Sequence, residues 1–142
     1  MAVERTLLIV KPDAVAAGNA GNILAMLEGA GGFTVRALRM EHLTDESAKK
    51  FYEVHKERPF YGELVEFMTS GPCIPMVLEK EDAITALRTF IGATNPAEAA
   101  EGTVRKRYAT NIQNNAVHAS DSPESAAKEI PHFFPRIPVE VG

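Results

Sequence analysis

Residues 114–122 read NNAVHASDS, and this stretch decides the fold because a strand end and a helix start meet in it. Its apolar pair AV predicts a short strand, which we place at residues 116–119. The SPE that follows at 122–124 is typical of a helix start, with proline in the first turn. His118 therefore lies where a strand gives way to a helix. That position suits either a plain strand end before a capped helix or a histidine that takes part in chemistry.

Outward from this stretch, hydrophobic patterns predict three more strands and four more helices. Runs of branched or alternating apolar residues predict strands at residues 6–10, 33–40 and 73–79. Apolar residues at helical spacing predict helices at 20–30, at 62–69 and at 82–90, and one that Thr44 caps and that ends before Pro59. In that last helix, Phe51 and Val54 are expected on the inner face.

Two segments lack a clear period. Residues 92–115 predict a long loop, and a loop of this length inside a compact domain is usually functional. The tail after Pro131 is rich in proline and is expected to be irregular. Four strands separated by helices fit a sheet covered by helices on one face, so we predict a mainly antiparallel α/β sandwich. With 142 residues, the whole chain (1–142) is expected to form one domain.

Composition narrows the class of protein. The net charge of −4 argues against a nucleic-acid binder with a broad basic surface, although a local cluster of cations can still bind a small anion. Cys73 is the single cysteine, so no intrachain disulfide can form and a reducing compartment is expected. The apolar run at residues 7–10 is too short for a signal peptide or a membrane span. We expect a cytoplasmic protein without a membrane partner.

Common devices for binding phosphates or metals are missing from the sequence. No glycine is followed by lysine, which excludes a P-loop. The stretch GAGG at residues 29–32 follows a predicted helix, whereas a dinucleotide fingerprint precedes one, so it predicts a helix stop. One cysteine and four scattered histidines give no zinc spacing. If the protein handles phosphates, side chains must bind them.

Four segments together resemble the nucleoside diphosphate kinase family. NAVHASDS closely resembles the family's active-site motif, N-x-x-H-[GA]-S-D-[GSA]. The others are ERTLLIVKPDAV at 4–15, FYEVHKERPFYGELVEFMTSGP at 51–72 and GATNPAEAAEGTVR at 92–105. They agree with the family in order and spacing and cover nearly the whole chain, which is expected to be of the bacterial type.

The resemblance implies a fold, an activity and an assembly. The implied fold is α+β: a ferredoxin-like α/β sandwich whose four-stranded antiparallel sheet is covered by helices. The implied activity is ping-pong transfer of the γ-phosphoryl of a nucleoside triphosphate, mainly ATP, to nucleoside and deoxynucleoside diphosphates through a phosphohistidine. Mg²⁺ is the implied cofactor, and a homo-oligomer, either a tetramer or a hexamer, is the implied assembly.

The catalytic roles follow from the same motif positions. The resemblance makes His118 the nucleophile and Nδ1 its attacking atom. Glu129 is expected to orient the ring, because it lies in the helix that starts after Ser122 and helical side chains lean toward the helix start. Ser120 is expected to hold the Glu129 carboxylate. Tyr52 would lie near the transferred phosphoryl; that role rests on the resemblance alone, and plain packing is the alternative.

The remaining motif positions describe a nucleotide site. Arginine guanidinium groups fork onto phosphate oxygens, and positioning with charge neutralisation does most of the work in phosphoryl transfer. The expected phosphate-binding residues are Lys11, Arg58, Arg88, Arg105, Thr94 and His55. The expected base and ribose contacts are Phe60, on which the base stacks, Leu64 and Ile112, which complete an apolar slot, and Asn115 with Lys11 at the ribose hydroxyls.

Mg²⁺ is expected to arrive on the nucleotide's own phosphates, because the sequence offers no dedicated carboxylate cage. Asp121 either reaches the ion through water or caps the helix that follows. One departure from the family lies beside Arg105, where Lys106 and Arg107 stand in a region that commonly carries an acidic residue.

Two other kinds of protein fit the sequence less well. A catalytically silent family member would be expected to have lost His118, Lys11 or an arginine of the motifs, and all are present. An RNA-binding module on a similar sheet would need exposed aromatic residues on its central strands, but the strands predicted at 6–10 and 73–79 have none.

Overall fold

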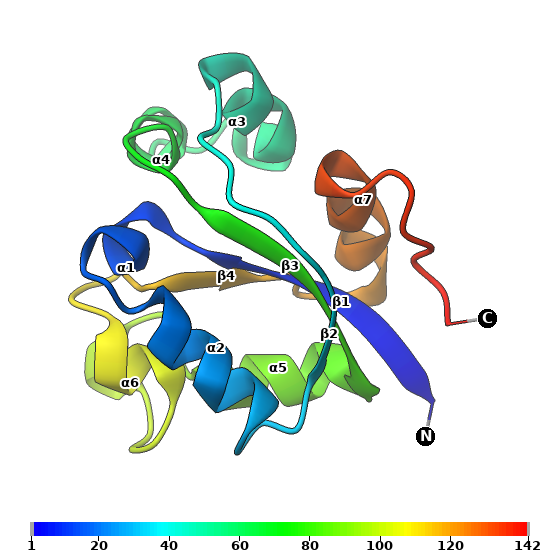
Figure 1. The fold of residues 1–142 in the computed structure, drawn as a ribbon. Helices are drawn as coiled ribbons and strands as arrows, with labels where there is room; N and C mark the ends of the chain where they lie inside the picture. Colours follow the sequence, from blue (N-terminus) through cyan, green and yellow to red (C-terminus); the bar gives the residue numbers. More distant parts are fainter. Residues whose placement is uncertain (1, 142) are drawn as a thin grey trace.

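The computed structural model describes residues 2–141, which form one four-stranded sheet with helices packed on it (Figure 1). Its strands are β1 (Val3–Val10), β2 (Thr34–Leu38), β3 (Ile74–Glu81) and β4 (Val117–Ala119). They lie in the order β2-β3-β1-β4, and each neighbouring pair is antiparallel. The predicted ferredoxin-like, four-stranded antiparallel sheet is therefore confirmed.

Seven helices and two 3₁₀ turns connect the strands within the described residues. The helices are α1 (Pro12–Ala16), α2 (Ala20–Glu28), α3 (Asp45–Phe51), α4 (Tyr61–Met68), α5 (Ala83–Ile91), α6 (Val104–Tyr108) and α7 (Pro123–Phe133); the turns are η1 (Glu53–His55) and η2 (Pro96–Glu98). None of these helices combines the length and the apolar character needed to cross a membrane.

Helices cover both faces of the sheet, so the prediction of a single covered face was wrong. Alternate residues of β1 point to opposite faces, and the last four residues of the strand, 7–10, are all apolar and buried. Leu7 and Ile9 pack with α3, α4 and α7, whereas Leu8 and Val10 pack with α1, α2, α5 and α6. Figure 1 shows these two groups of helices on either side of the sheet. A strand that is apolar on both faces has to be covered twice.

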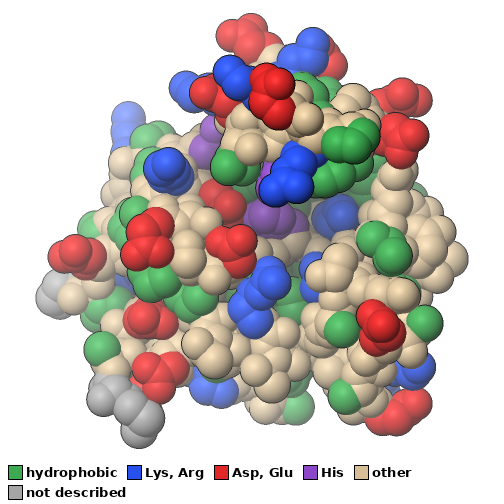
Figure 2. Space-filling view, turned by 180° about the vertical axis from the view of Figure 1, so that it is seen from behind, with side chains coloured by type: hydrophobic (Ala, Val, Ile, Leu, Met, Phe, Trp, Pro, Cys, Tyr) green, Lys and Arg blue, Asp and Glu red, His purple; other side chains and the backbone are tan. Residues whose placement is uncertain are grey.

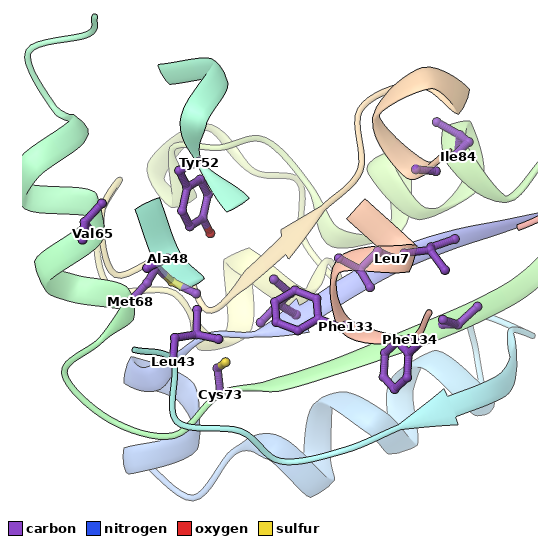
Figure 3. Close-up of a cluster of buried hydrophobic side chains, with 14 residues drawn as sticks. Leu7, Leu43, Ala48, Tyr52, Val65, Met68, Cys73, Ile84, Phe133 and Phe134 are labelled. Carbon is purple, nitrogen blue, oxygen red and sulfur yellow. The ribbon is translucent and has the colours of Figure 1, made fainter. Parts of the chain in front are cut away.

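The first of these two cores lies between the sheet and the helices α3, α4 and α7. Figure 3 shows Ala48 and Tyr52 from the α3 segment, Met68 from α4 and Phe133 from α7 gathered in it. Each side chain is almost fully buried. Burial of this kind stabilises a fold by about 25 cal/mol per Å² of apolar surface, so this packing fixes where α3 and α7 lie over β4.

Helix caps explain two of the helix starts that the sequence predicts. The Thr44 side chain accepts a hydrogen bond from the Ser47 backbone N–H at the start of α3. In the same way, Ser122 Oγ accepts from the Ser125 N–H, at 3.0 Å, at the start of α7. Both caps satisfy backbone donors that have no partner inside the helix. Both predictions are confirmed.

Several local predictions were wrong. Val54 is 84% exposed, because α3 ends at Phe51 and a 3₁₀ turn follows that breaks the helical spacing. The segment 92–115 contains η2 and α6, which are too short to show a period. Helix α1 was missed for the same reason. Helix α7 runs through Pro131 to Phe133, so the irregular tail begins later than expected.

We predict that Ser122→Ala lowers the free energy of unfolding by about 1 kcal/mol, because the Ser125 N–H loses its capping partner. Urea unfolding followed by circular dichroism measures this change. Ser122→Thr keeps a capping hydroxyl and is the matched control, expected to retain most of the stability. An alanine variant as stable as the wild type would contradict the role of the cap in holding α7.

Candidate active site

Strand β4 presents His118 on the face of the sheet that α3 and α7 cover. Val117 and Ala119 pack in the core on the opposite face, and strand alternation turns the residue between them the other way. His118 pairs with Ile9 of β1, which fixes its height along the sheet. Its ring lies edge-on to the rings of Phe51 and Tyr52, with centroids 5.3 and 6.0 Å away.

One nitrogen of His118 is bound to the protein. Nε2 lies 2.9 Å from Oε1 of Glu129, and Ser120 Oγ donates to the same carboxylate oxygen at 2.8 Å. A carboxylate can only accept hydrogen bonds, so Nε2 carries the proton and the Nδ1 of the neutral ring keeps its lone pair. The structure thus brings together the expected nucleophile, its orienting residue and the serine that supports it.

Lys11 lies at the carboxyl end of β1 and is 7% exposed. Its ammonium donates to Oδ1 of Asn115 at 2.9 Å and to the carbonyl of Gln113 at 3.2 Å. Burial lowers the Lys11 pKa from 10.5 to about 8; Asp13 partly opposes this change and Arg105 adds to it. Lys11 and Asn115, which the sequence places together at the ribose, therefore form one hydrogen-bonded unit.

Arg105, in α6, is 5% exposed, and its guanidinium is bonded to the backbone at three places. Nε, Nη1 and Nη2 donate to the carbonyls of Asn115, Gly92 and Val117, respectively, at 2.9–3.3 Å. Burial, together with the positive charge of Arg88, lowers the pKa of Arg105 from 12.5 to about 10. Two arginines and Lys11 thus form a series of like charges that act on one another.

Arg88 and Thr94 line a pocket of about 490 Å³ between α5 and the segment that follows it. The Arg88 guanidinium donates to the carbonyl of Ala119, next to His118, at 3.4 Å. Figure 2 shows histidine side chains within a recess of the surface, with lysine and arginine side chains around it. The Thr94 side chain is exposed, and the backbone carbonyl of Thr94 accepts a hydrogen bond from the Asn115 side chain.

The other expected nucleotide-binding residues are more exposed. The His55 ring lies 5.4 Å from that of Phe60 and 6.5 Å from that of Tyr52, which connects this group to His118. Phe60 and Ile112 are exposed apolar side chains, as a stacking surface requires. Leu64 instead packs partly against the core. Arg58 is exposed, and no hydrogen bond from its side chain is seen within residues 2–141.

Asp121 lies just before α7 and is hydrogen-bonded to the first turn of that helix. The Ser125 hydroxyl donates to its carboxylate at 2.6 Å and lowers the pKa of that carboxyl, and the nearby Arg88 acts in the same direction. Of the two roles that the sequence left open, this contact favours the one at the helix start.

Sequence reasoning missed several residues that shape the site. The Phe67 ring lies 5.2 Å from the Lys11 ammonium, and the Gln113 carbonyl accepts a hydrogen bond from it. Asp13 Oδ2 accepts from the Ala116 N–H at 3.1 Å, two residues before His118. These contacts join positions about 50 or 100 residues apart, so local patterns give no signal for them. Only the place of Asp13, just after Lys-Pro at the end of a strand, could have drawn notice.

Comparison with known proteins agrees with this geometry. The family model described as nucleoside diphosphate kinase matches residues 4–139. The chain belongs to the nucleoside diphosphate kinase family. It is therefore a phosphotransferase that acts on nucleotides, and the expectation from the sequence motifs is confirmed at this level.

Relatives in the family match the chain over almost its entire length. It is 57% identical over 139 residues to the nucleoside diphosphate kinase of Persephonella marina, covering 98% of this chain and 99% of the relative. The nucleoside diphosphate kinase of Chlorobaculum parvum is 59% identical over 132 residues, covering 93% and 94%. A crystal structure of the Aquifex aeolicus nucleoside diphosphate kinase superposes with a TM-score of 0.91 at 52% identity, covering 94% of this chain and 96% of that one.

We predict that kcat/KM for ATP falls as the pH rises through about 8, because Lys11 loses its charge there. The rate falls with rising pH because only the protonated Lys11 ammonium neutralises the charge of a phosphate. Lys11→Arg should lower the rate but also remove this alkaline limb, since guanidinium stays charged over this range. Steady-state rates between about pH 6 and 10 measure both effects. An alkaline limb that persists unchanged in Lys11→Arg would assign it to another group.

Proposed function

We propose that His118 carries the phosphoryl group between two nucleotides in a ping-pong reaction. The observation that supports this most strongly is the state of its ring: Nε2 is bound to Glu129, and Nδ1 keeps its lone pair. Arg105 and Arg88 donate to the backbone carbonyls of Val117 and Ala119, on either side of His118. A nucleophile oriented by a second group that is itself held by a third is the arrangement that covalent catalysis uses.

In the first half-reaction, the Nδ1 lone pair of His118 attacks the γ-phosphorus of a nucleoside triphosphate. The bond from phosphorus to the bridging oxygen breaks, and its electron pair leaves on the diphosphate. The ring gains positive charge as the N–P bond forms, and the Glu129 carboxylate at Nε2 offsets it. A second nucleoside diphosphate then attacks the phosphohistidine through its terminal oxygen, which restores the neutral ring.

The cations would neutralise the charge that moves during transfer. Lys11 and Arg105 are held rigidly by protein groups, and Arg88 lies beside both Ala119 and the pocket. Pre-positioned cations in a partly buried site stabilise anionic oxygens more strongly than mobile cations in water do. Arg58, His55 and Thr94 would add contacts from the rim.

Phe60 would hold the base by stacking, and Ile112 and Leu64 would complete the apolar slot. Stacking contributes about 1–3 kcal/mol per base and works for every base, since each has a π-face. A site that binds the base in this way and the phosphates by charge should accept nucleoside and deoxynucleoside diphosphates alike.

Mg²⁺ would enter on the phosphates of the nucleotide, where it neutralises charge when bound. Within residues 2–141 no group of three or more His, Cys, Asp or Glu side chains is arranged to hold a metal ion. The residues proposed to bind phosphate, Lys11, Arg88 and Arg105, are cations and not metal ligands. This fits a Mg²⁺ ion that the nucleotide carries into the site. A water-mediated contact from Asp121 to the ion is the alternative to its role at the start of α7, which its hydrogen bond with Ser125 favours. A single kinase domain over residues 1–142, a cytoplasmic location and the lack of a nucleic-acid partner remain predictions.

We predict that incubation with γ-labelled ATP and Mg²⁺ produces a phosphoprotein whose label is stable to alkali and lost in acid. This label should pass to GDP or to a deoxynucleoside diphosphate, and chelation of Mg²⁺ should slow its formation. His118→Ala should abolish labelling, because the nucleophile is gone. If His118→Ala is labelled as fully as the wild type, the proposed mechanism is wrong.

His132→Ala provides the matched control for that experiment. The His132 ring packs on Phe51 at 5.2 Å, as the His118 ring does at 5.3 Å, but its Nε2 is hydrogen-bonded to the Ser47 hydroxyl and not to a carboxylate. Its labelling should match the wild type. Glu129→Gln keeps an accepting oxygen and removes the charge, so it should slow labelling without changing the final extent.

We also propose that the chain assembles as a tetramer or a hexamer. The support from the structure is the edge strand β2, where Leu38 is exposed and Met40 follows it, also exposed. An edge strand presents unpaired backbone groups to which another chain can pair, and exposed apolar side chains beside it favour such a contact. Light scattering after size-exclusion chromatography should give about four or six times the 15.4 kDa mass of one chain. A mass of one chain would contradict the assembly.

A further inference from the structure

The turn that leads into β4 is strained. Ala116 has a φ of +72°, in the left-handed region that residues other than glycine rarely adopt. The Val117 N–H donates to the carbonyl of Asn115 at 2.8 Å, so the three residues form a γ-turn. A γ-turn with positive φ is rare and strained, and such a conformation persists only when its surroundings hold it in place.

Both sides of this turn carry residues of the active site. Asn115, at its start, accepts the hydrogen bond from the Lys11 ammonium. Val117, at its end, is followed directly by His118. A turn that relaxed to a negative φ would move the amide of Asn115 relative to the imidazole of His118. The conformation of the turn therefore sets where Asn115, and the Lys11 ammonium bonded to it, lie relative to His118.

Three residues outside the turn hold it. Asp13 Oδ2 accepts from the Ala116 N–H at 3.1 Å, and the Ala116 carbonyl accepts from the Lys11 backbone N–H at 2.9 Å. Arg105 donates to the carbonyls of Asn115 and Val117. Of these three residues, Asp13 is the one whose side chain binds the strained residue Ala116 itself.

Asp13 also has an unusual environment. Its second oxygen, Oδ1, is buried and has no hydrogen-bond partner within residues 2–141. Leaving a buried carboxylate oxygen without a partner is unfavourable, so other interactions must hold the side chain there. Lys11 belongs to the same helix start, two residues earlier, and its positive charge compensates that of Asp13.

We propose that Asp13 is a positioning residue for phosphoryl transfer: it holds the strained turn at Ala116 and thereby fixes Lys11 and Asn115 relative to His118. The proposal rests on the function proposed above for His118 and Lys11. In this role Asp13 has no need to touch the nucleotide or the reacting atoms. It acts through the Ala116 N–H and through its charge beside the Lys11 ammonium.

The first test is the rate at which ATP phosphorylates His118 in two variants. Asp13→Ala should be slower by about 10- to 100-fold, because a displacement of about 1 Å at a reacting centre has an effect of this size. Asp13→Asn keeps an oxygen that can accept from Ala116 and should lose less. Asp45→Ala is the matched control, since Asp45 also lies in the first turn of a short helix but pairs with Lys49 on the surface. It should react like the wild type.

The second test separates positioning from general loss of structure. Glycine adopts positive φ without strain, so the turn in Ala116→Gly has little tendency to relax when Asp13 is removed. Asp13→Ala should therefore slow phosphorylation about tenfold less in the Ala116→Gly background than in the wild-type background. Equal effects in the two backgrounds would overturn the proposed hold on the turn, and circular dichroism would show whether each variant is folded.

The third test uses the pH profile, which a purely structural role would leave unchanged. The groups that face the Lys11 ammonium are the charged Asp13 from α1 and Arg105 from α6, the side chain of Asn115, the Gln113 carbonyl and the Phe67 ring from α4. In Asp13→Asn the acid that raises the Lys11 pKa is gone. The alkaline limb of the Asp13→Asn variant should therefore move to lower pH. Its phosphorylation rate relative to that of the wild type should fall about threefold or more between pH 6.5 and pH 8.

These outcomes separate the role of Asp13 from the proposed function of His118. If the wild type forms no phosphoenzyme at His118, the proposed function fails. If the wild type forms one but Asp13→Ala reacts as fast as Asp45→Ala, only the role of Asp13 is overturned. An unchanged alkaline limb in Asp13→Asn would contradict its electrostatic part alone.

Discussion

The hydrogen bond between His118 and Glu129 is the constraint on which the rest of the site depends. It joins a strand of only three residues to the helix that follows, so both must be placed accurately. Pairing with β1 places the strand, and the Ser122 cap together with the burial of Ala126, Ile130 and Phe133 places the helix. Glu129 lies at the edge of this buried stripe, where its carboxylate can face the sheet. Ser120 then leaves the carboxylate one favourable orientation, and the ring is left with one free nitrogen.

The cations around this ring store unfavourable free energy in the absence of an anion. Folding lowers the pKa of Lys11 from 10.5 to about 8, so the protonated lysine opposes folding by about 3 kcal/mol. The sign follows from the lowered pKa: the penalty is present in full below pH 8 and disappears as the pH rises toward 10.5. A phosphate bound beside Lys11 would remove much of the penalty at neutral pH. A charged Lys11 therefore favours phosphate binding but opposes folding, and packing elsewhere in the protein has to compensate for its cost.

Local sequence signals carried most of the fold and the centre of the site, whereas long-range contacts did not show in the sequence. The strand and the cap within residues 114–122 were predictable, because apolar alternation and Ser-Pro-Glu act over a few residues. The spacing between His118 and Glu129 could be read from the lean of helical side chains. Helices of five residues, such as α1 and α6, show no period. The unbroken apolar run of β1 indicates that helices cover both faces of the sheet, because neighbouring residues of a strand point to opposite faces. The Asp13–Ala116 contact depends on tertiary structure alone.

Arg105 shows why a residue identified by a motif can serve two purposes at once. A guanidinium has five N–H donors, and the backbone carbonyls of Gly92, Asn115 and Val117 take one donor from each of its three nitrogens. One donor on Nη1 and one on Nη2 remain, which is the pair that a bidentate contact with a phosphate needs. The bonds to the backbone hold both β4 and the start of the segment after α5, so the arginine ties the strand that carries His118 to the segment that lines the pocket. A lysine at this position would carry the same charge but could not fork to these carbonyls. The geometry of the guanidinium, more than its charge, makes this position specific.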